Sequence, residues 1–475
     1  MDIILIAVIL IVGFYTAWNI GANDVANAMG TSVGSGALSI KQAILIAAIL
    51  EFSGAFFFGS HVSKTMQSGI INPEIFASNP RLLVYGMLAA LASAGIWLQC
   101  ASYYGWPVST THSIVGSIVG VGAVVGGYEA VYWKEVGFIV SSWVLSPILG
   151  GILAYYIFMI IRKKIFYASD PLEATRKWTP LLVFFVSLIL LSVLIFEGLH
   201  NIQLYLSMLE KIALVLGGGG IASFISYLLV QRMPRSDQNE VERKISLYNP
   251  ESVYSLDKAR KHLKKVESQL QGELQYNLSI LVEEIDYISH SIQQKQEFDN
   301  SHSEYTKVEK VFGYLQIISA CMMAFAHGAN DVANAIGPLS AAIGILTTGL
   351  LAVEAPVPTW ALALGGTGIV IGLATWGWRV IETIGKKITE LTPSRGFAAE
   401  FGAATTIVLA SRLGLPISTT HTLVGAVLGV GFARGLGAIN LTTTRNILIS
   451  WLITVPLGAI LAILLFYPIR AIFGG

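Results

Sequence analysis

Charged residues are scarce in this chain of 475 residues: only 12% are Asp, Glu, Lys or Arg, whereas 54% are hydrophobic. A soluble globular protein of this length would carry more charge, and the mean hydropathy of +0.66 excludes that class. The formal net charge is only +1, so the overall charge predicts no acidic partner such as nucleic acid. The composition predicts a polytopic membrane protein.

Cysteine is nearly absent, with only Cys100 and Cys321, both inside apolar segments. Two distant thiols provide neither a disulfide framework nor a metal-ligand cluster. The glycine run at 217–220 lacks the Lys-Ser/Thr ending of a P-loop, and no nucleophile and base stand in a recognisable arrangement. The sequence therefore predicts neither an enzyme nor a bound organic cofactor.

Apolar runs are what the chain has in abundance. They reach or exceed the roughly 20 residues that cross a bilayer as a helix and do not alternate with period two, which favours helices over a barrel. The first, at 3–36, is long enough to be a broken helix, and the short stretch at 339–353 is expected to be compressed or re-entrant. We expect an all-α protein with about 12 transmembrane helices. The segments lie at 3–36, 40–60, 82–104, 107–128, 132–161, 179–196, 204–230, 311–337, 339–353, 359–381, 397–413, 416–434 and 446–466.

A polar segment at 231–310 divides the apolar runs. Arginines and lysines follow the membrane segments that end near 161 and 230, and the positive-inside rule places these loops in the cytoplasm. Within the polar segment, apolar residues recur at three- and four-residue steps, which indicates amphipathic helices forming a hairpin or a short coiled-coil pair. We therefore expect a multi-pass cell-membrane protein with both termini extracytoplasmic and 231–310 as a cytoplasmic helical loop.

The chain contains a long internal repeat. Gly-Ala-Asn-Asp-Val-Ala-Asn-Ala occurs at 21–28 and again at 328–335, and Pro-x-Ser-Thr-Thr-His occurs at 107–112 and 416–421, at nearly the same spacing. Trp143 and Trp451 keep that spacing too, so duplication is the economical explanation. Five crossings and then two more make the first copy start outside and the second start inside. Copies with an odd number of crossings that start on opposite sides are inverted relative to each other, with their motifs near the midplane. The predicted parts are a first transmembrane repeat at 1–161, two connecting helices at 162–230, the loop at 231–310 and the second, inverted repeat at 311–475.

The octapeptide predicts a cation site. A helix brings Asn23, Asp24 and Asn27 to one side, and these side chains supply hard oxygen ligands. The nearby glycines allow a helix break that would release further carbonyl ligands. An ionisable side chain inside the membrane is a functional candidate by default. The second copy repeats the arrangement with Asn330, Asp331 and Asn334.

The Ser-Thr-Thr-His motifs predict an anion site. A proline followed by hydroxyl residues, ahead of an apolar run, is a helix-start signature, and a helix N-terminus presents free N–H groups to an anion. Ordinary helix capping is the alternative explanation of each motif. His112 and His421 follow the hydroxyls, and hydrogen bonding, titration and simple packing all remain open for them. The hydroxyl residues are Ser109, Thr110, Thr111, Ser418, Thr419 and Thr420.

The two sites require each other. Neither motif contains Lys or Arg, so an anion beside Asp24 and Asp331 would be repelled unless cations lay between them. This predicts obligatory coupling of anion transport to a cation. Further polar residues in or near the apolar segments are candidates for lining the pathway: Gln42, Glu51, Glu400 and Arg412.

With both pairs of motifs in hand, the chain resembles the PiT family of inorganic phosphate transporters, over both membrane halves. The resemblance implies symport of inorganic phosphate with a cation, which is sodium in some members and protons in others. It also implies that Asn23, Asp24, Asn27, Asn330, Asp331 and Asn334 bind the cations and help define the substrate site. By the same resemblance Ser109 to Thr111 and Ser418 to Thr420 surround phosphate.

We therefore expect a secondary transporter that imports phosphate by alternating access, coupled to sodium because all-oxygen ligands suit a hard cation. The alternatives are a proton-coupled phosphate or sulfate permease and, from other classes, an anion channel or a membrane receptor. The expected partners are phosphate, sodium and the lipid bilayer, with a homodimer as a further possibility.

Overall fold

The computed structural model describes residues 2–198, 206–232, 250–267, 273–349, 351, 357–386, 388–435 and 439–474. Within these ranges regular structure is helical, and the only β contact is an isolated bridge between Ile71 and Val131 in two loops. The predicted all-α class is confirmed.

The first half of the chain contains α1 (Asp2–Gly34), α2 (Ile40–Phe58), α3 (Ser60–Ser68), η1 (Pro73–Phe76), α4 (Pro80–Tyr103), α5 (Thr110–Val125), η2 (Tyr128–Ala130), α6 (Trp133–Ile161) and η3 (Arg162–Phe166). Next come α7 (Pro171–Val193), η4 (Leu194–Gly198) and α9 (Met208–Gln231). The second half contains α11 (Pro250–Glu267), α12 (Glu273–Thr348), α13 (Thr359–Trp376), α14 (Trp378–Lys386), α15 (Pro393–Arg412), α16 (Thr419–Arg434) and α17 (Leu441–Phe473).

Within the described residues, nine helices are long and apolar enough to cross a membrane, fewer than the twelve predicted. The predicted segments at 107–128, 397–413 and 416–434 are not among these nine. The 16-residue α5 is about 24 Å long, which is shorter than the roughly 30 Å hydrocarbon core. In addition, the stretches predicted at 311–337 and 339–353 belong to one helix, α12, which continues through Pro338 to Thr348. The rest of 339–353 lies largely outside the described residues.

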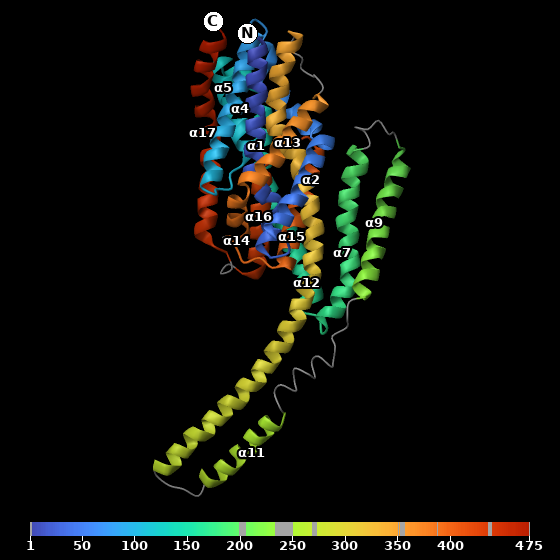
Figure 1. Cartoon of the computed structure of the whole chain (residues 1–475), viewed down its shortest axis with the longest axis vertical. Coiled ribbons are helices and arrows are strands. Elements are labelled where there is room, and N and C mark those ends of the chain that lie inside the picture. Colours follow the sequence, from blue (N-terminus) through green and yellow to red (C-terminus); the bar gives the residue numbers. More distant parts are fainter. Residues whose placement is uncertain are drawn as a thin grey trace.

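The helices form one bundle with a long extension at one end (Figure 1). Both chain termini lie at the opposite end, where Arg81 at the start of α4 pairs with Asp2 at 3.0 Å and Tyr85 donates to the Phe473 carbonyl at 2.9 Å. The extension consists of α11 and the N-terminal part of α12, so the predicted helices of the polar segment are confirmed where it is described. The α7–α9 pair lies at the side of the bundle (Figure 1).

Two helical hairpins meet inside the bundle. The start of α4 packs on the end of α5, where a Cβ on Gly86 would lie 2.9 Å from Val121, so both open ends of this hairpin are on the side of the termini. The α15–α16 hairpin opens at the other end, where Arg434 contacts Glu390 at 3.2 Å just before α15 begins. The turns of both hairpins therefore lie in the middle of the protein, which is where the Ser-Thr-Thr-His motifs begin.

Candidate functional site

The first octapeptide lies on α1 in the interior of the bundle. Asn23, Asp24 and Asn27 are at most 1% exposed. Gly21 lets α1 approach α13 closely, because a Cβ there would overlap the carbonyl oxygen of Ile369.

The prediction of a broken helix here is wrong, since α1 is helical without interruption from Asp2 to Gly34. The polar side chains of the motif find their partners in side chains and in the turn of the α4–α5 hairpin. No carbonyl of α1 has to leave the helix to satisfy them.

The second octapeptide occupies the equivalent position on α12. Asn330, Asp331 and Asn334 are at most 2% exposed. Gly328 allows close approach to α2, because a Cβ there would overlap the carbonyl oxygen of Glu51. The two motifs therefore share burial, helical conformation and a glycine-mediated helix contact.

The hairpin turns hold the Ser-Thr-Thr-His motifs beside the two helices. Gly105 and Gly414 have φ values of +67° and +66°, a conformation that favours glycine. Their carbonyls accept equivalent hydrogen bonds, from Thr383 to Gly105 at 2.9 Å and from Thr65 to Gly414 at 2.9 Å. Both turns are thereby anchored to the surrounding helices.

The serines of the motifs act as helix caps. Ser109 Oγ accepts a hydrogen bond from the His112 backbone N–H at 3.2 Å, and Ser418 Oγ accepts one from the His421 N–H at 3.1 Å. Ordinary capping, the alternative left open by the sequence, is thus the contact that both serines make. The first N–H groups of α5 and α16 still face the middle of the protein without partners within their own helices.

The first threonine of each motif contacts an aspartate. Thr110 Oγ1 donates to Asp24 Oδ2 at 2.8 Å, and Thr419 Oγ1 donates to Asp331 Oδ2 at 2.8 Å. Each aspartate thus accepts from the residue that starts the second helix of the neighbouring hairpin. The predicted cation and anion residues are in direct contact rather than in separate sites.

The second asparagine of each octapeptide reaches into the other copy. The Asn27 amide donates to Thr420 Oγ1 at 2.8 Å and to Thr419 Oγ1 at 3.4 Å. The Asn334 amide makes the converse contacts, to Thr110 at 3.1 Å and to Thr111 at 3.2 Å. The structure therefore brings the sequence-predicted residues of both halves into one buried network.

The hairpin turns also touch each other directly. Thr111 Oγ1 donates to the Ile417 carbonyl at 2.9 Å, and Thr420 Oγ1 donates to the Val108 carbonyl at 3.2 Å. In each contact, the second threonine of one motif donates to the carbonyl of the residue before the serine of the other motif. The two contacts are therefore equivalent.

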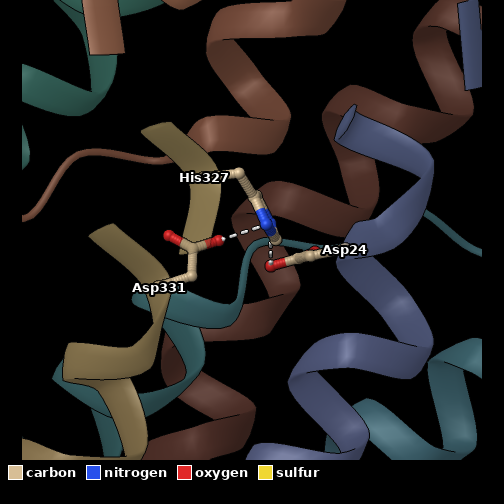
Figure 2. Close-up of side chains that lie close together, drawn as sticks. All are labelled: Asp24, His327 and Asp331. Atoms are coloured by element: carbon tan, nitrogen blue, oxygen red, sulfur yellow. Dashed lines mark ion pairs between the residues drawn. The ribbon is translucent and has the colours of Figure 1, made fainter. Parts of the chain in front are cut away.

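His327 is a site residue that the sequence analysis missed (Figure 2). Its Nε2 lies 3.0 Å from Asp331 Oδ2 and 4.0 Å from Asp24 Oδ2, and its Nδ1 lies 3.4 Å from Glu51 Oε2. The imidazole is fully buried. The i, i+4 spacing of His327 and Asp331 on one helix face was the available signal.

This cluster can hold a cation or a proton. Donor atoms of Asp24, His327 and Asp331 all lie within 4.8 Å of one another. Asn27 belongs to the same hydrogen-bonded network, and its Oδ1 is buried without a hydrogen-bond partner. Apart from His327, the named residues of the network include no side chain that can carry a positive charge.

The other pathway candidates lie elsewhere. Glu400 is fully buried and accepts hydrogen bonds from four side chains, those of Thr31, Ser32, Gln316 and Ser319. Gln42 belongs to the capping box at the start of α2, and the Arg412 guanidinium lies over the Phe196 ring at 5.1 Å. Of these candidates, Glu51 alone contacts the Asp24–His327–Asp331 cluster.

The comparison with known proteins covers the same residues. A model of the phosphate transporter family matches residues 20–462, a range that contains both copies of each motif. The chain belongs to the phosphate transporter family. It is 47% identical to the inorganic phosphate transporter 2-1, chloroplastic, of Arabidopsis thaliana over 96% of this chain and 70% of that protein.

A solved structure extends the likeness to three dimensions. The structure described as the sodium-dependent phosphate transporter is 37% identical, with a TM-score of 0.78 over 99% of this chain and 100% of that one. As a member of the phosphate transporter family with several apolar helices of membrane length, the chain is a multi-pass membrane protein.

Proposed function

We propose that this protein imports inorganic phosphate by symport with sodium, using alternating access. The observation that carries the proposal is the pair of buried aspartates, each hydrogen-bonded to the threonine that starts a helix at the middle of the protein. A carboxylate offers a ligand to a cation, and a helix N-terminus offers N–H groups to an anion. The two ligands of a symporter would therefore meet on the same residues.

We further propose that the chain consists of two inverted repeats, 1–161 and 311–475, joined by the helices of 162–230 and the cytoplasmic loop of 231–310. The reciprocal contacts of Asn27 and Asn334 support a two-fold relation between the halves. In this arrangement the α4–α5 and α15–α16 hairpins are re-entrant from opposite sides of the membrane, and both termini are extracytoplasmic. Rocking of one repeat against the other would open the site to each side in turn.

Charge balance explains why the cation must bind with the anion. A phosphate oxygen about 4 Å from a carboxylate would be repelled by ~4 kcal/mol at an effective dielectric constant of about 20. A sodium ion on Asp24 or Asp331 cancels that repulsion. A bound sodium ion would also make the aspartate carboxylates weaker hydrogen-bond acceptors. The hydroxyls of Thr110 and Thr419 would then be free to donate to phosphate.

Two considerations favour sodium. The predicted ligands are oxygen atoms, which suit a hard cation. The structural neighbour, 37% identical, is described as sodium-dependent.

His327 favours the second candidate, proton-coupled transport. An imidazole that faces three carboxylates can carry a proton between them, with Asp331 at 3.0 Å and Glu51 at 3.4 Å as its nearest acceptors. In that mechanism protonation of the cluster would neutralise the site as sodium does in the first.

Phosphate is preferred over sulfate by hydrogen bonding. A phosphate that retains a proton can donate it to Asp24 or Asp331, whereas sulfate at neutral pH carries none. The aspartates therefore discriminate between two anions of similar shape.

Uptake of labelled phosphate into proteoliposomes, with sodium and proton gradients imposed separately, tests the coupling ion. Sodium coupling predicts uptake against a concentration difference when only the sodium gradient is present. Uptake driven equally by a pH gradient in potassium medium would transfer the assignment to protons. Sulfate in excess should compete poorly.

The same vesicles test the transporter class and the site. Conductance without accumulation would identify a channel, and binding without flux would identify a receptor. Asp24→Asn and Asp331→Asn should each abolish coupled uptake in protein that elutes as a folded species. Wild-type uptake by either variant would remove that aspartate from the mechanism.

A further inference from the structure

A large cavity lies on the other side of the hairpin motifs from the proposed transport site. Its volume is about 1130 Å³, and it lies between α6 and α17 over α16. Its walls are mostly apolar, and its rim carries exposed side chains such as Val144 at 61% and Leu452 at 79% exposure. The cavity therefore opens toward the hydrocarbon of the membrane and is large enough for a lipid-sized molecule.

The floor of this cavity is polar. His112 and His421, the last residues of the two Ser-Thr-Thr-His motifs, line it and stack with ring centroids 4.2 Å apart. Each is only 4% exposed, and His112 Nδ1 and His421 Nε2 are buried without a hydrogen-bond partner. Buried ring nitrogens without partners are rare, because an unmade hydrogen bond in an apolar setting is costly.

The two tryptophans beside these histidines differ in a way that points to a ligand. Trp143 packs on His112 at 3.8 Å between centroids, and its Nε1 donates to the Pro416 carbonyl at 3.1 Å. Trp451 packs on His421 at 3.5 Å, but its Nε1 is buried without an acceptor. Residues that line the floor thus hold one indole donor and two imidazole nitrogens that have no hydrogen-bond partner in the protein.

From this combination we propose that the cavity is a binding site for a neutral lipid with a hydroxyl head and a hydrocarbon body. A hydroxyl both donates and accepts, so it can accept from the Trp451 indole and donate to a free imidazole nitrogen. None of the residues lining the cavity is Lys or Arg, so an anionic phospholipid or fatty-acid head has no charged partner there. The hydrocarbon body lies along α6 and α17.

This lipid would sit directly behind the transport residues. His112 and His421 follow Thr111 and Thr420, whose hydroxyls bridge the two hairpin turns. A molecule that hydrogen-bonds the floor would therefore hold the two turns in one arrangement and stabilise the folded protein. The site itself stands on its own geometry and does not depend on which ion or anion is transported.

Photolabelling of the purified full-length protein in liposomes tests the site. The probe is hexadecan-1-ol carrying a diazirine on its chain, and labelled peptides are identified by mass spectrometry. We expect labels on α6 and α17, displaced by unlabelled hexadecan-1-ol and much less by hexadecane. Equal competition by hexadecane, or labels confined to other helices, would overturn the proposal.

Three variants separate recognition from general partitioning. Trp451→Phe keeps the ring packed on His421 and removes only the N–H, so the affinity for the probe should fall about fivefold, the value of one ordinary hydrogen bond. Val144→Trp fills the cavity from its rim and should remove the label. Leu145→Trp, at a lipid-exposed position of the same helix that does not line the cavity, is the matched control and should label as wild type.

Unchanged labelling of Val144→Trp would overturn the site. A second copy of the chain is the competing occupant, and Val144→Cys addresses it. Disulfide formation between two chains through this residue in liposomes, with exclusion of the probe, would assign the cavity to a dimer interface instead. A rise in the unfolding temperature with hexadecan-1-ol, absent in Val144→Trp, completes the expected result.

Discussion

The two amides that cross between the halves provide the most direct test of a shared site. Asn27→Ala removes the donor to Thr420 at 2.8 Å and to Thr419 at 3.4 Å. Asn334→Ala removes the equivalent donor to Thr110 at 3.1 Å and to Thr111 at 3.2 Å. Because the contacts correspond, the two substitutions should have similar effects.

The expected magnitude follows from burial. Leaving a buried hydroxyl without its donor costs about 1–3 kcal/mol. If that cost falls on the arrangement that binds phosphate, the apparent affinity should drop roughly 5- to 150-fold in each variant. The double variant should lose less than the sum of the two, because the four threonines share one network.

The assay is the concentration dependence of phosphate uptake into proteoliposomes with an inward sodium gradient. Asn19→Ala is the matched control: Asn19 is fully buried on the same helix, but its amide donates only to the Tyr15 carbonyl one turn earlier, at 3.0 Å. An effect of Asn27→Ala with none of Asn334→Ala would refute the equivalence of the halves. Wild-type behaviour of both would refute the role of the crossed amides.

Three further predictions concern the surroundings of the site. Gly328→Ala would press against the backbone of Glu51 and should destabilise the protein by about 1–3 kcal/mol in thermal unfolding. Its control, Gly313→Ala on the same helix, meets nothing within 4 Å and should be neutral or slightly stabilising. Equal unfolding temperatures of the two variants would contradict the tight α2–α12 contact. Glu400→Gln keeps the shape of the side chain but removes the charge that four side chains bind, so the unfolding temperature should fall. The control is Glu390→Gln, at a side chain that is 78% exposed. Equal unfolding temperatures for the two variants would argue against a charge-dependent cluster. His327→Gln removes the imidazole that contacts Asp331 but should retain sodium-driven uptake, as measured in the same vesicles. Loss of sodium-driven uptake in folded protein would favour proton coupling through this imidazole.

Much of the site could be predicted because each of its two motifs occurs twice in the sequence. Identical octapeptides at Gly21 and Gly328 pointed to two equivalent helices, and both copies are buried on helices. The direct contacts of Asp24 with Thr110 and of Asp331 with Thr419 were not predicted. Helix starts at the Ser-Thr-Thr-His motifs were also correct, since capping is a local property of a serine before a helix.

The same reliance on duplication concealed His327. The residue that precedes the other octapeptide is Ile20, so a comparison of the copies gives no reason to select this position. The carboxylate of Glu51 reaches His327 from α2, at a sequence separation that no local pattern reveals. Tertiary contact alone assembles this part of the cluster.

The predicted number of crossings was not confirmed, for a different reason. Hydropathy measures whether a segment can lie in the membrane, not whether it reaches the far side. The α4–α5 and α15–α16 hairpins turn back in the middle of the protein at Gly105 and Gly414. Both termini lie at the end of the bundle opposite the extension formed by α11 and the start of α12, as Figure 1 shows.

Because α12 is unbroken, the extension formed by α11 and the N-terminal part of α12 can report on motion at the buried site. The helix runs from Glu273 through Asp331 to Thr348 without a loop that could decouple the ends. At 1.5 Å per residue, Tyr305 stands about 39 Å along the helix from Asp331, so a 10° tilt about the aspartate would carry it by roughly 7 Å. A pair of spin labels, one on this arm and one on the bundle, would convert angular changes too small to resolve at the buried site into distances that are readily measured.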